Sequence, residues 1–119
     1  MRDFRKYKVW QESFSIVKEV YRLMESLPQN ERYGLASQMG RAAVSIPSNI
    51  SEGCSRSSDI EFKRFLEIAM GSAFELETQL MLCQEMTFID PEQAYATIEK
   101  LQRVEASLNA LIQKIKTKL

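Results

Sequence analysis

The sequence of 119 residues contains no histidine. Histidine is the base of serine and cysteine nucleophile arrangements, and it ligates the metals of ferritin-like bundles. The arginine–histidine pair on which some helical-bundle ribonucleases rely is missing for the same reason. Glu75 and Glu77 on the third predicted helix are two residues apart and so point to different sides. We therefore expect no enzyme, no catalytic residue, no metal and no cofactor.

Cysteine, glycine and long apolar runs are also scarce. The two cysteines, Cys54 and Cys83, do not have the spacing of a metal site. None of the four glycines belongs to a phosphate-binding loop that follows a strand. No apolar run approaches the roughly 20 residues of a membrane span, and the N-terminus lacks an apolar signal core. We expect a reduced cytoplasmic protein without a membrane partner or a recognisable small-molecule substrate.

Charge is balanced over the whole chain but not along it. Residues 1–64 hold eleven basic and eight acidic side chains, whereas residues 65–113 hold two basic and eight acidic ones. A basic half beside an acidic half permits head-to-tail association or a local anion site. The chain lacks the overall basicity that is typical of a nucleic-acid-binding domain.

Apolar side chains recur at spacings of three and four residues, which predicts helices. Four such segments cover about residues 9–27, 31–52, 59–86 and 91–117, and no strand pattern or internal repeat occurs. Short connections between long helices are typical of antiparallel neighbours. The sequence therefore predicts one all-α domain over residues 1–119, an antiparallel up-down-up-down four-helix bundle.

Several residues mark where these helices begin and end. Ser58 followed by Glu61 forms a capping box, and Asp90 followed by Pro91 is a second N-terminal signal. At the end of the second helix, Gly53 is expected to adopt the left-handed C′ conformation.

Pro47 lies inside the pattern of the second helix and cannot donate the usual backbone hydrogen bond. The apolar stripe of this helix nevertheless continues beyond the proline. Its members are Leu35, Met39, Ala42, Ile46 and Ile50. We therefore expect Pro47 to bend the helix without ending it, so that helical structure reaches about Ser51.

Two apolar stripes lie side by side on the first helix. The aromatic residues of one stripe, Trp10, Phe14 and Tyr21, are interpreted as core rather than as a ligand cage. On the second and third helices, Gln38 and Gln79 are expected to pack tightly or to form a buried hydrogen bond between helices.

The third helix is apolar on more than one side. Besides its main stripe it carries Met70, Phe74 and Met81 on another face. Because a four-helix monomer covers only one face of a helix, these three residues are predicted to form an oligomer interface. Gly71 in mid-helix is expected to allow close approach of another backbone.

Two groups of basic residues are candidates for contact with nucleic-acid phosphates. The first is Arg41, Arg56, Lys63 and Arg64. Here the N-terminus of the third helix would help to bind an anion, but the neighbouring carboxylates Glu52, Asp59 and Glu61 favour ordinary solvated charge.

The second group is Arg2, Arg5, Lys6 and Lys8, with Phe4 and Tyr7 interleaved. Basic residues beside aromatic rings suit an RNA backbone with stacked bases, and the alternative is a frayed polar terminus.

One long string of residues resembles a known family. It comprises Tyr33-Gly34-Leu35, Gln38, Arg-Ala-Ala-Val-Ser-Ile-Pro-Ser-Asn-Ile over residues 41–50, and Glu52-Gly53. Further matches are Val9-Trp10-Gln11, Glu61-Phe62-x-Arg64-Phe65-Leu66 and Gly71-Ser72-x-x-Glu75-Leu76-Glu77-Thr78-Gln79-Leu80. Over its first two thirds the chain thus resembles the four-helix-bundle proteins encoded in bacterial 23S rRNA intervening sequences. Gly40 departs from the family, which usually has a basic residue there.

The resemblance implies a non-enzymatic homo-oligomer, most often a homopentamer, that associates with RNA or with a nucleic-acid-processing protein. The family is also similar to the accessory variability determinant of diversity-generating retroelements, a basic pentameric bundle that binds nucleic acid and reverse transcriptase. The alternative is a protein–protein interaction scaffold without nucleic-acid binding. Zero net charge and the surplus apolar helix faces favour this alternative.

Overall fold

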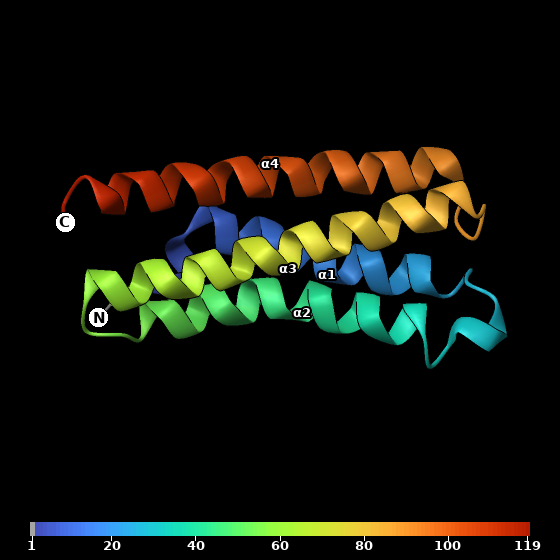
Figure 1. The fold of residues 1–119 in the computed structure, drawn as a ribbon, viewed down its shortest axis with the longest axis horizontal. Helices are drawn as coiled ribbons and strands as arrows, with labels where there is room; N and C mark the ends of the chain where they lie inside the picture. Colours follow the sequence, from blue (N-terminus) through green and yellow to red (C-terminus); the bar gives the residue numbers. More distant parts are fainter. Residues whose placement is uncertain (1) are drawn as a thin grey trace.

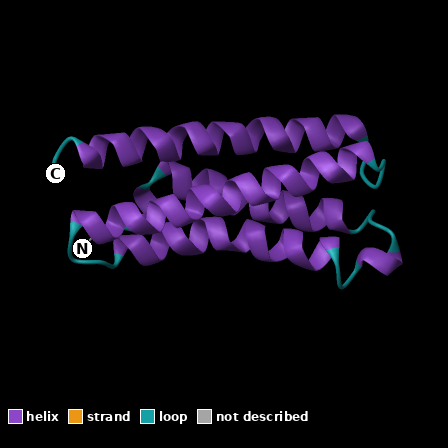
Figure 2. Cartoon of the chain, viewed as in Figure 1, coloured by secondary structure: helices purple, strands orange, loops and turns teal. Residues whose placement is uncertain are grey.

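Four long α-helices lie along one axis and alternate in direction in the computed structural model, which describes residues 2–119 (Figure 1). They are α1 (Lys8–Met24), α2 (Leu35–Cys54), α3 (Asp59–Glu85) and α4 (Pro91–Lys116). Two short 3-10 helices, η1 (Phe4–Lys6) and η2 (Gln29–Glu31), precede α1 and α2. Throughout residues 2–119 the remaining segments are loops, without a strand (Figure 2). The predicted antiparallel four-helix bundle is confirmed.

Each helix packs against two neighbours, so that the bundle closes in the cyclic order α1–α2–α3–α4. Within the described residues, the diagonal pairs α1–α3 and α2–α4 show no close backbone approach. The α1–α2 pair and the α3–α4 pair therefore form opposite sides of the molecule.

The core is built from the apolar stripes that the sequence predicts. Fully buried side chains come from all four helices, and α3 supplies the most. The largest of them are Phe62, Met39, Ile46, Ile50, Leu66, Leu76, Leu80, Ile89, Leu101 and Leu108. Each buried side chain of this size contributes roughly 1.5–3 kcal/mol relative to exposure. Burial of these stripes determines which side of each helix faces the core, and therefore which side faces outward.

The predicted start signals are confirmed by their hydrogen bonds. The Ser58 side chain accepts from the Glu61 backbone N–H at 3.2 Å, and Asp90 accepts from that of Gln93 at 3.2 Å. The boundaries around the first connection differ from the prediction. The first helix ends at Met24, and the second begins at Leu35, because η2 forms a separate turn between them.

Pro47 is buried inside α2, and the helix continues past it to Cys54, as predicted. The prediction for Gly53 was wrong: it lies within α2, and no described glycine has a positive φ angle. A Cβ at Gly53 would stand 2.8 Å from Cβ of Phe65 and 3.2 Å from the Phe62 ring. Glycine is required here because α3 crosses the end of α2 at close range.

The expectation for Gly71 was also wrong. A Cβ built at this position meets no atom within 4 Å, so no other segment within residues 2–119 approaches its backbone. Gly71 lies on the outward side of α3, where the bundle offers no neighbour.

Candidate interaction surfaces

A groove runs along the outer side of the bundle between α1 and α2. At the end of the groove beside the start of α1 lies a hollow of about 320 Å³. The residues that line this hollow are Phe4, Trp10, Phe14, Val17, Lys18, Val44, Pro47, Ser48 and Ser51. We call this feature, with its continuation along the same two helices, the α1–α2 groove.

Aromatic rings form one wall of the α1–α2 groove. The Phe4 and Trp10 rings meet edge-on with centroids 5.0 Å apart, and Trp10 lies 5.0 Å from Phe14. Phe14 is 48% exposed and Tyr21 is 51% exposed, so the prediction that they belong to the core was wrong. The physical reason is the bundle's cyclic order, since no third helix covers the outer side of α1 and α2.

The α1–α2 groove continues along the same side. Tyr21, Met24, Gly40, Arg41 and Val44 line its middle section. A Cβ at Gly40 would lie 3.3 Å from Cε of Met24, so glycine keeps the floor of this section open to that side chain.

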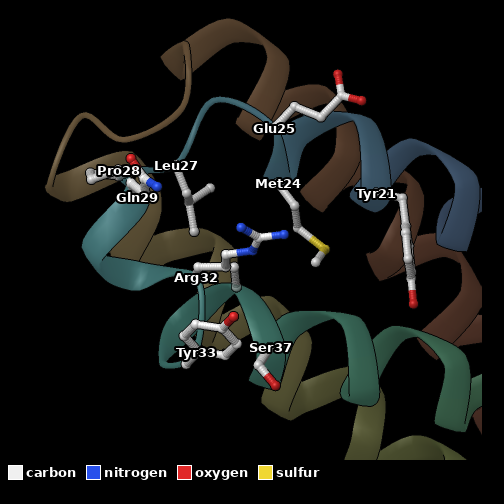
Figure 3. A pocket seen from close by; sticks show the side chains of 10 residues that line it. Tyr21, Met24, Glu25, Leu27, Pro28, Gln29, Arg32, Tyr33 and Ser37 are labelled. Carbon is white, nitrogen blue, oxygen red and sulfur yellow. The ribbon is translucent and has the colours of Figure 1, made fainter.

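The last section of the groove lies beside the α1–α2 connection and has a volume of about 760 Å³ (Figure 3). There the Arg32 guanidinium points between Met24, Leu27 and Ser37. Among the described residues, Arg32 forms no ion pair. The groove is thus mainly apolar, with Lys18, Arg41 and Arg32 along it and Glu25 in its last section.

The opposite side of the bundle carries the predicted interface residues of α3. Phe74 is 56% exposed and Met81 is 51% exposed, whereas Met70 is half-buried against the core. We call these three residues the α3–α4 face. Because residues 65–113 have six more acidic than basic side chains, this face belongs to the acidic half of the chain.

Two carboxyl groups meet between α3 and α4 beside this face. Glu105 lies beside Glu77, and Nε2 of Gln102 donates to Oε2 of Glu77 at 3.1 Å. Burial first, and then the Glu77 hydrogen bond and charge, raise the pKa of Glu105 to about 8. The sequence contained a signal for this pair: Glu105 lies seven residues after Ile98 and seven before Ile112, on the apolar stripe of α4. Sequence reasoning considered only Glu75 and Glu77 and missed it.

The buried Gln79 does not form the expected bond between helices. Its Nε2 donates to Glu75 in the same helix at 3.4 Å, and its Oε1 is buried without a partner. Between α2 and α3 the bond is instead made by the hydroxyls of Ser45 and Ser72, which lie 2.8 Å apart.

The first basic group does not form a single cluster. Arg56 pairs with Glu52 at 3.3 Å, and Lys63 pairs with Glu67 at 3.2 Å. Arg41 lies in α2, about 20 Å along the helix from its end at Cys54, and Arg56 lies beyond that end. Arg64 is exposed on α3. Because carboxylates neutralise Arg56 and Lys63, these two residues fit the interpretation as ordinary solvated charge.

The N-terminal segment packs onto the bundle. Arg2 donates to the Arg56 carbonyl at 2.8 Å, pairs with Asp59 and lies over the Phe62 ring. Arg2 belongs to the predicted second basic group, and these contacts bring it to Arg56 of the first group at the α2–α3 turn. With Arg56 and two serines it lines an open hollow of about 600 Å³.

The aromatic side chains of this segment are used in packing. Phe4 contacts Trp10, and Tyr7 meets Phe62 edge-on with ring centroids 5.9 Å apart. They are therefore not free to stack on bases, while the side chains of Arg5, Lys6 and Lys8 remain exposed. Only the charged part of the predicted second group is available.

Other chemistry finds little support in residues 2–119. No three potential ligands from His, Cys, Asp and Glu gather into a metal-binding group there. Cys54 and Cys83 are free and buried, and burial raises the pKa of Cys83 to about 11, so both remain unreactive thiols. Within the same residues, no helix is both long enough and apolar enough to span a bilayer.

Residues 5–110 match the model of the 23S rRNA-intervening sequence protein family. The chain belongs to this family. Among solved structures it is similar to a protein of unknown function from the S23 ribosomal protein family of Bacteroides thetaiotaomicron, with a TM-score of 0.80 and 26% sequence identity. That similarity covers 87% of this chain and 97% of the other. No curated protein matches the chain. The family predicted from the motif residues is confirmed.

Proposed function

We propose that this 23S rRNA-intervening sequence protein is a non-enzymatic scaffold that assembles from copies of itself. The observation that carries the proposal is the presence of two apolar surfaces on opposite sides of one bundle. Exposed apolar patches of this kind mark interaction sites on soluble proteins. A monomer leaves both the α1–α2 groove and the α3–α4 face in water.

The two surfaces differ in shape and charge in a complementary way. The α1–α2 groove is concave and carries Lys18 and Arg41, whereas the α3–α4 face projects Phe74 and Met81 from the acidic half. We propose that the α3–α4 face of one copy enters the α1–α2 groove of the next. An interface between two different surfaces is heterologous and produces a ring when the rotation closes. Family resemblance gives five as the number of copies.

Light scattering on the purified protein tests this proposal. The expected mass is a multiple of the 13.8 kDa chain, and a monomer at micromolar concentration would refute self-assembly. Phe74→Glu and Phe14→Glu each place a charge on one of the two surfaces, and each should dissociate the assembly. Leu82→Glu is the matched control, since Leu82 is exposed on α3 but lies about 80° around the helix from Phe74. Circular dichroism should show all three variants folded.

Mixing the two interface variants tests the heterologous arrangement. Phe14→Glu retains an intact α3–α4 face, and Phe74→Glu retains an intact α1–α2 groove. Each variant alone should be monomeric, and an equimolar mixture should form a heterodimer. If either variant alone dimerises, the surfaces pair with themselves and the arrangement is wrong.

A second candidate function is binding of RNA phosphates, which the family name supports. The specific observation is the hollow at the α2–α3 turn, where Arg2 and Arg56 lie near the N-terminus of α3. Contacts would be to phosphates, repeated on every subunit, and binding would fall steeply with salt.

A salt titration of binding to structured and single-stranded RNA tests this second function. Arg56→Glu should weaken binding to all RNAs alike, and Arg103→Glu, an exposed α4 residue paired with Glu99, is the control. Absence of binding at about 50 mM salt would favour a scaffold without nucleic acid, because counterion release is strongest there.

A further inference from the structure

The strongest unexplained feature of the bundle is a buried carboxylate oxygen without a donor. Oε2 of Glu105 is shielded from solvent and has no hydrogen-bond partner among the described residues. The groups beside it are Glu77, across the α3–α4 contact, and Gln102, whose amide is already used by Glu77. A buried charge without a partner is costly, so burial beside Glu77 favours the protonated form of Glu105.

No cation on the neighbouring elements neutralises this pair. On α4, Arg103 is directed to Glu99 at 3.9 Å, and Lys100 binds Glu19 of α1 at 3.0 Å. Glu12 of α1 lies at a separate α1–α4 hollow that Lys100 and Arg103 also line. From α3, Glu77 is the charged group whose field acts on Glu105.

The pair also lies beside the surface proposed for assembly. Phe74 precedes Glu77 by three residues and Met81 follows it by four, so these three side chains share one side of α3. Covering Phe74 and Met81 with a second copy would remove water from the carboxyl groups as well. Ionisation of both groups would then oppose assembly through both repulsion and desolvation.

We propose that Glu77 and Glu105 form a proton-dependent switch, which holds one shared proton in the assembled state and disfavours assembly when that proton is lost. This inference rests on the proposed self-assembly, because the switch acts on the α3–α4 face. The raised pKa of Glu105 in the single chain, about 8, places the transition in mildly alkaline solution. Assembly should raise this pKa further and therefore take up protons.

The experiment is light scattering of the full chain at a fixed concentration near the assembly midpoint, from pH 7 to pH 9.5. Wild type should lose mass as pH rises, with a dissociation constant that increases about tenfold for each unit by which assembly raises the pKa of Glu105. Glu105→Gln keeps the shape of the side chain without an ionisable group, and its mass should not depend on pH in this range. Glu61→Gln, at an exposed α3 position about 140° around the helix from Phe74, is the matched control and should behave as wild type.

A second measurement keeps the inference testable if Glu105→Gln does not fold. Carbon-13 NMR of the glutamate carboxyls in wild type should show one group that titrates near pH 8. An assembly whose mass is constant across this pH range would overturn the switch and leave the scaffold intact. A monomer at every pH would overturn the scaffold and the switch together. Titration of all glutamates near pH 4.5 would overturn the shared proton itself.

Discussion

The two helix contacts of α3 are built on different principles. Toward α2 the helices approach closely and meet through small residues. Gly53 leaves room for the Phe65 side chain, and the Ser45 hydroxyl forms a hydrogen bond with that of Ser72. Toward α4 the contact contains the Glu77–Glu105 pair and opens onto the exposed Phe74. A contact without room tolerates no added atoms, whereas a contact with ionisable groups responds to solution conditions.

The largest expected effect comes from adding atoms to the α2–α3 contact. Gly53→Val places a branched side chain where even Cβ stands 2.8 Å from Phe65, and overpacking should cost about 3 kcal/mol. Urea unfolding measures this loss. Gly71→Val is the matched control, because its Cβ meets open space, and its stability should stay within about 0.5 kcal/mol of wild type. Equal losses at both positions would contradict the proposed tightness of the α2–α3 contact.

A smaller effect is expected from proton loss in the α3–α4 contact. The pKa of Glu105 is raised to about 8 in the folded chain, so between pH 4.5 and pH 8 the folded state binds more protons than the unfolded state. The contribution of Glu105 to the free energy of unfolding is therefore fully present below pH 4.5, and it is lost as the pH rises through 8. Because Glu105 is partly exposed, we expect a total loss of about 2 kcal/mol rather than the full linkage value.

Thermal unfolding across pH measures this dependence. The comparison is made with Glu105→Gln, which should flatten the curve between pH 5 and pH 9, and the difference between the two proteins isolates this carboxyl. A curve that rises with pH in wild type, relative to the variant, would mean that Glu105 is ionised in the folded chain.

The smallest expected effect has the opposite sign. Gly71→Ala should stabilise the fold by up to about 1 kcal/mol, because alanine restricts the unfolded chain and meets no neighbour in α3. Differential scanning calorimetry below the assembly concentration measures the shift. A destabilised variant would show that another segment approaches Gly71 in solution.

The family motif and the pattern of apolar residues determined most of the fold. Spacings of three and four residues placed the inward side of each helix, and Ser58 and Asp90 marked two helix starts correctly. These features depend on neighbours in the sequence, so they can be read without tertiary information. The sequence also predicted that Phe74 and Met81 lie outside the core, because the third helix carries more apolar faces than a four-helix bundle covers.

What the sequence could not determine was which helix, if any, faces a given side chain. Gly53 and Gly71 are both mid-chain glycines near apolar residues, yet only the first has a neighbouring helix at close range. Phe14 belongs to an apolar stripe on α1, but the cyclic order of the helices leaves that stripe uncovered. Glu105 became notable only when α3 placed Glu77 beside it. Local periodicity sets the direction of a side chain, whereas its partners depend on how separate helices are arranged, and the tertiary structure alone decides that.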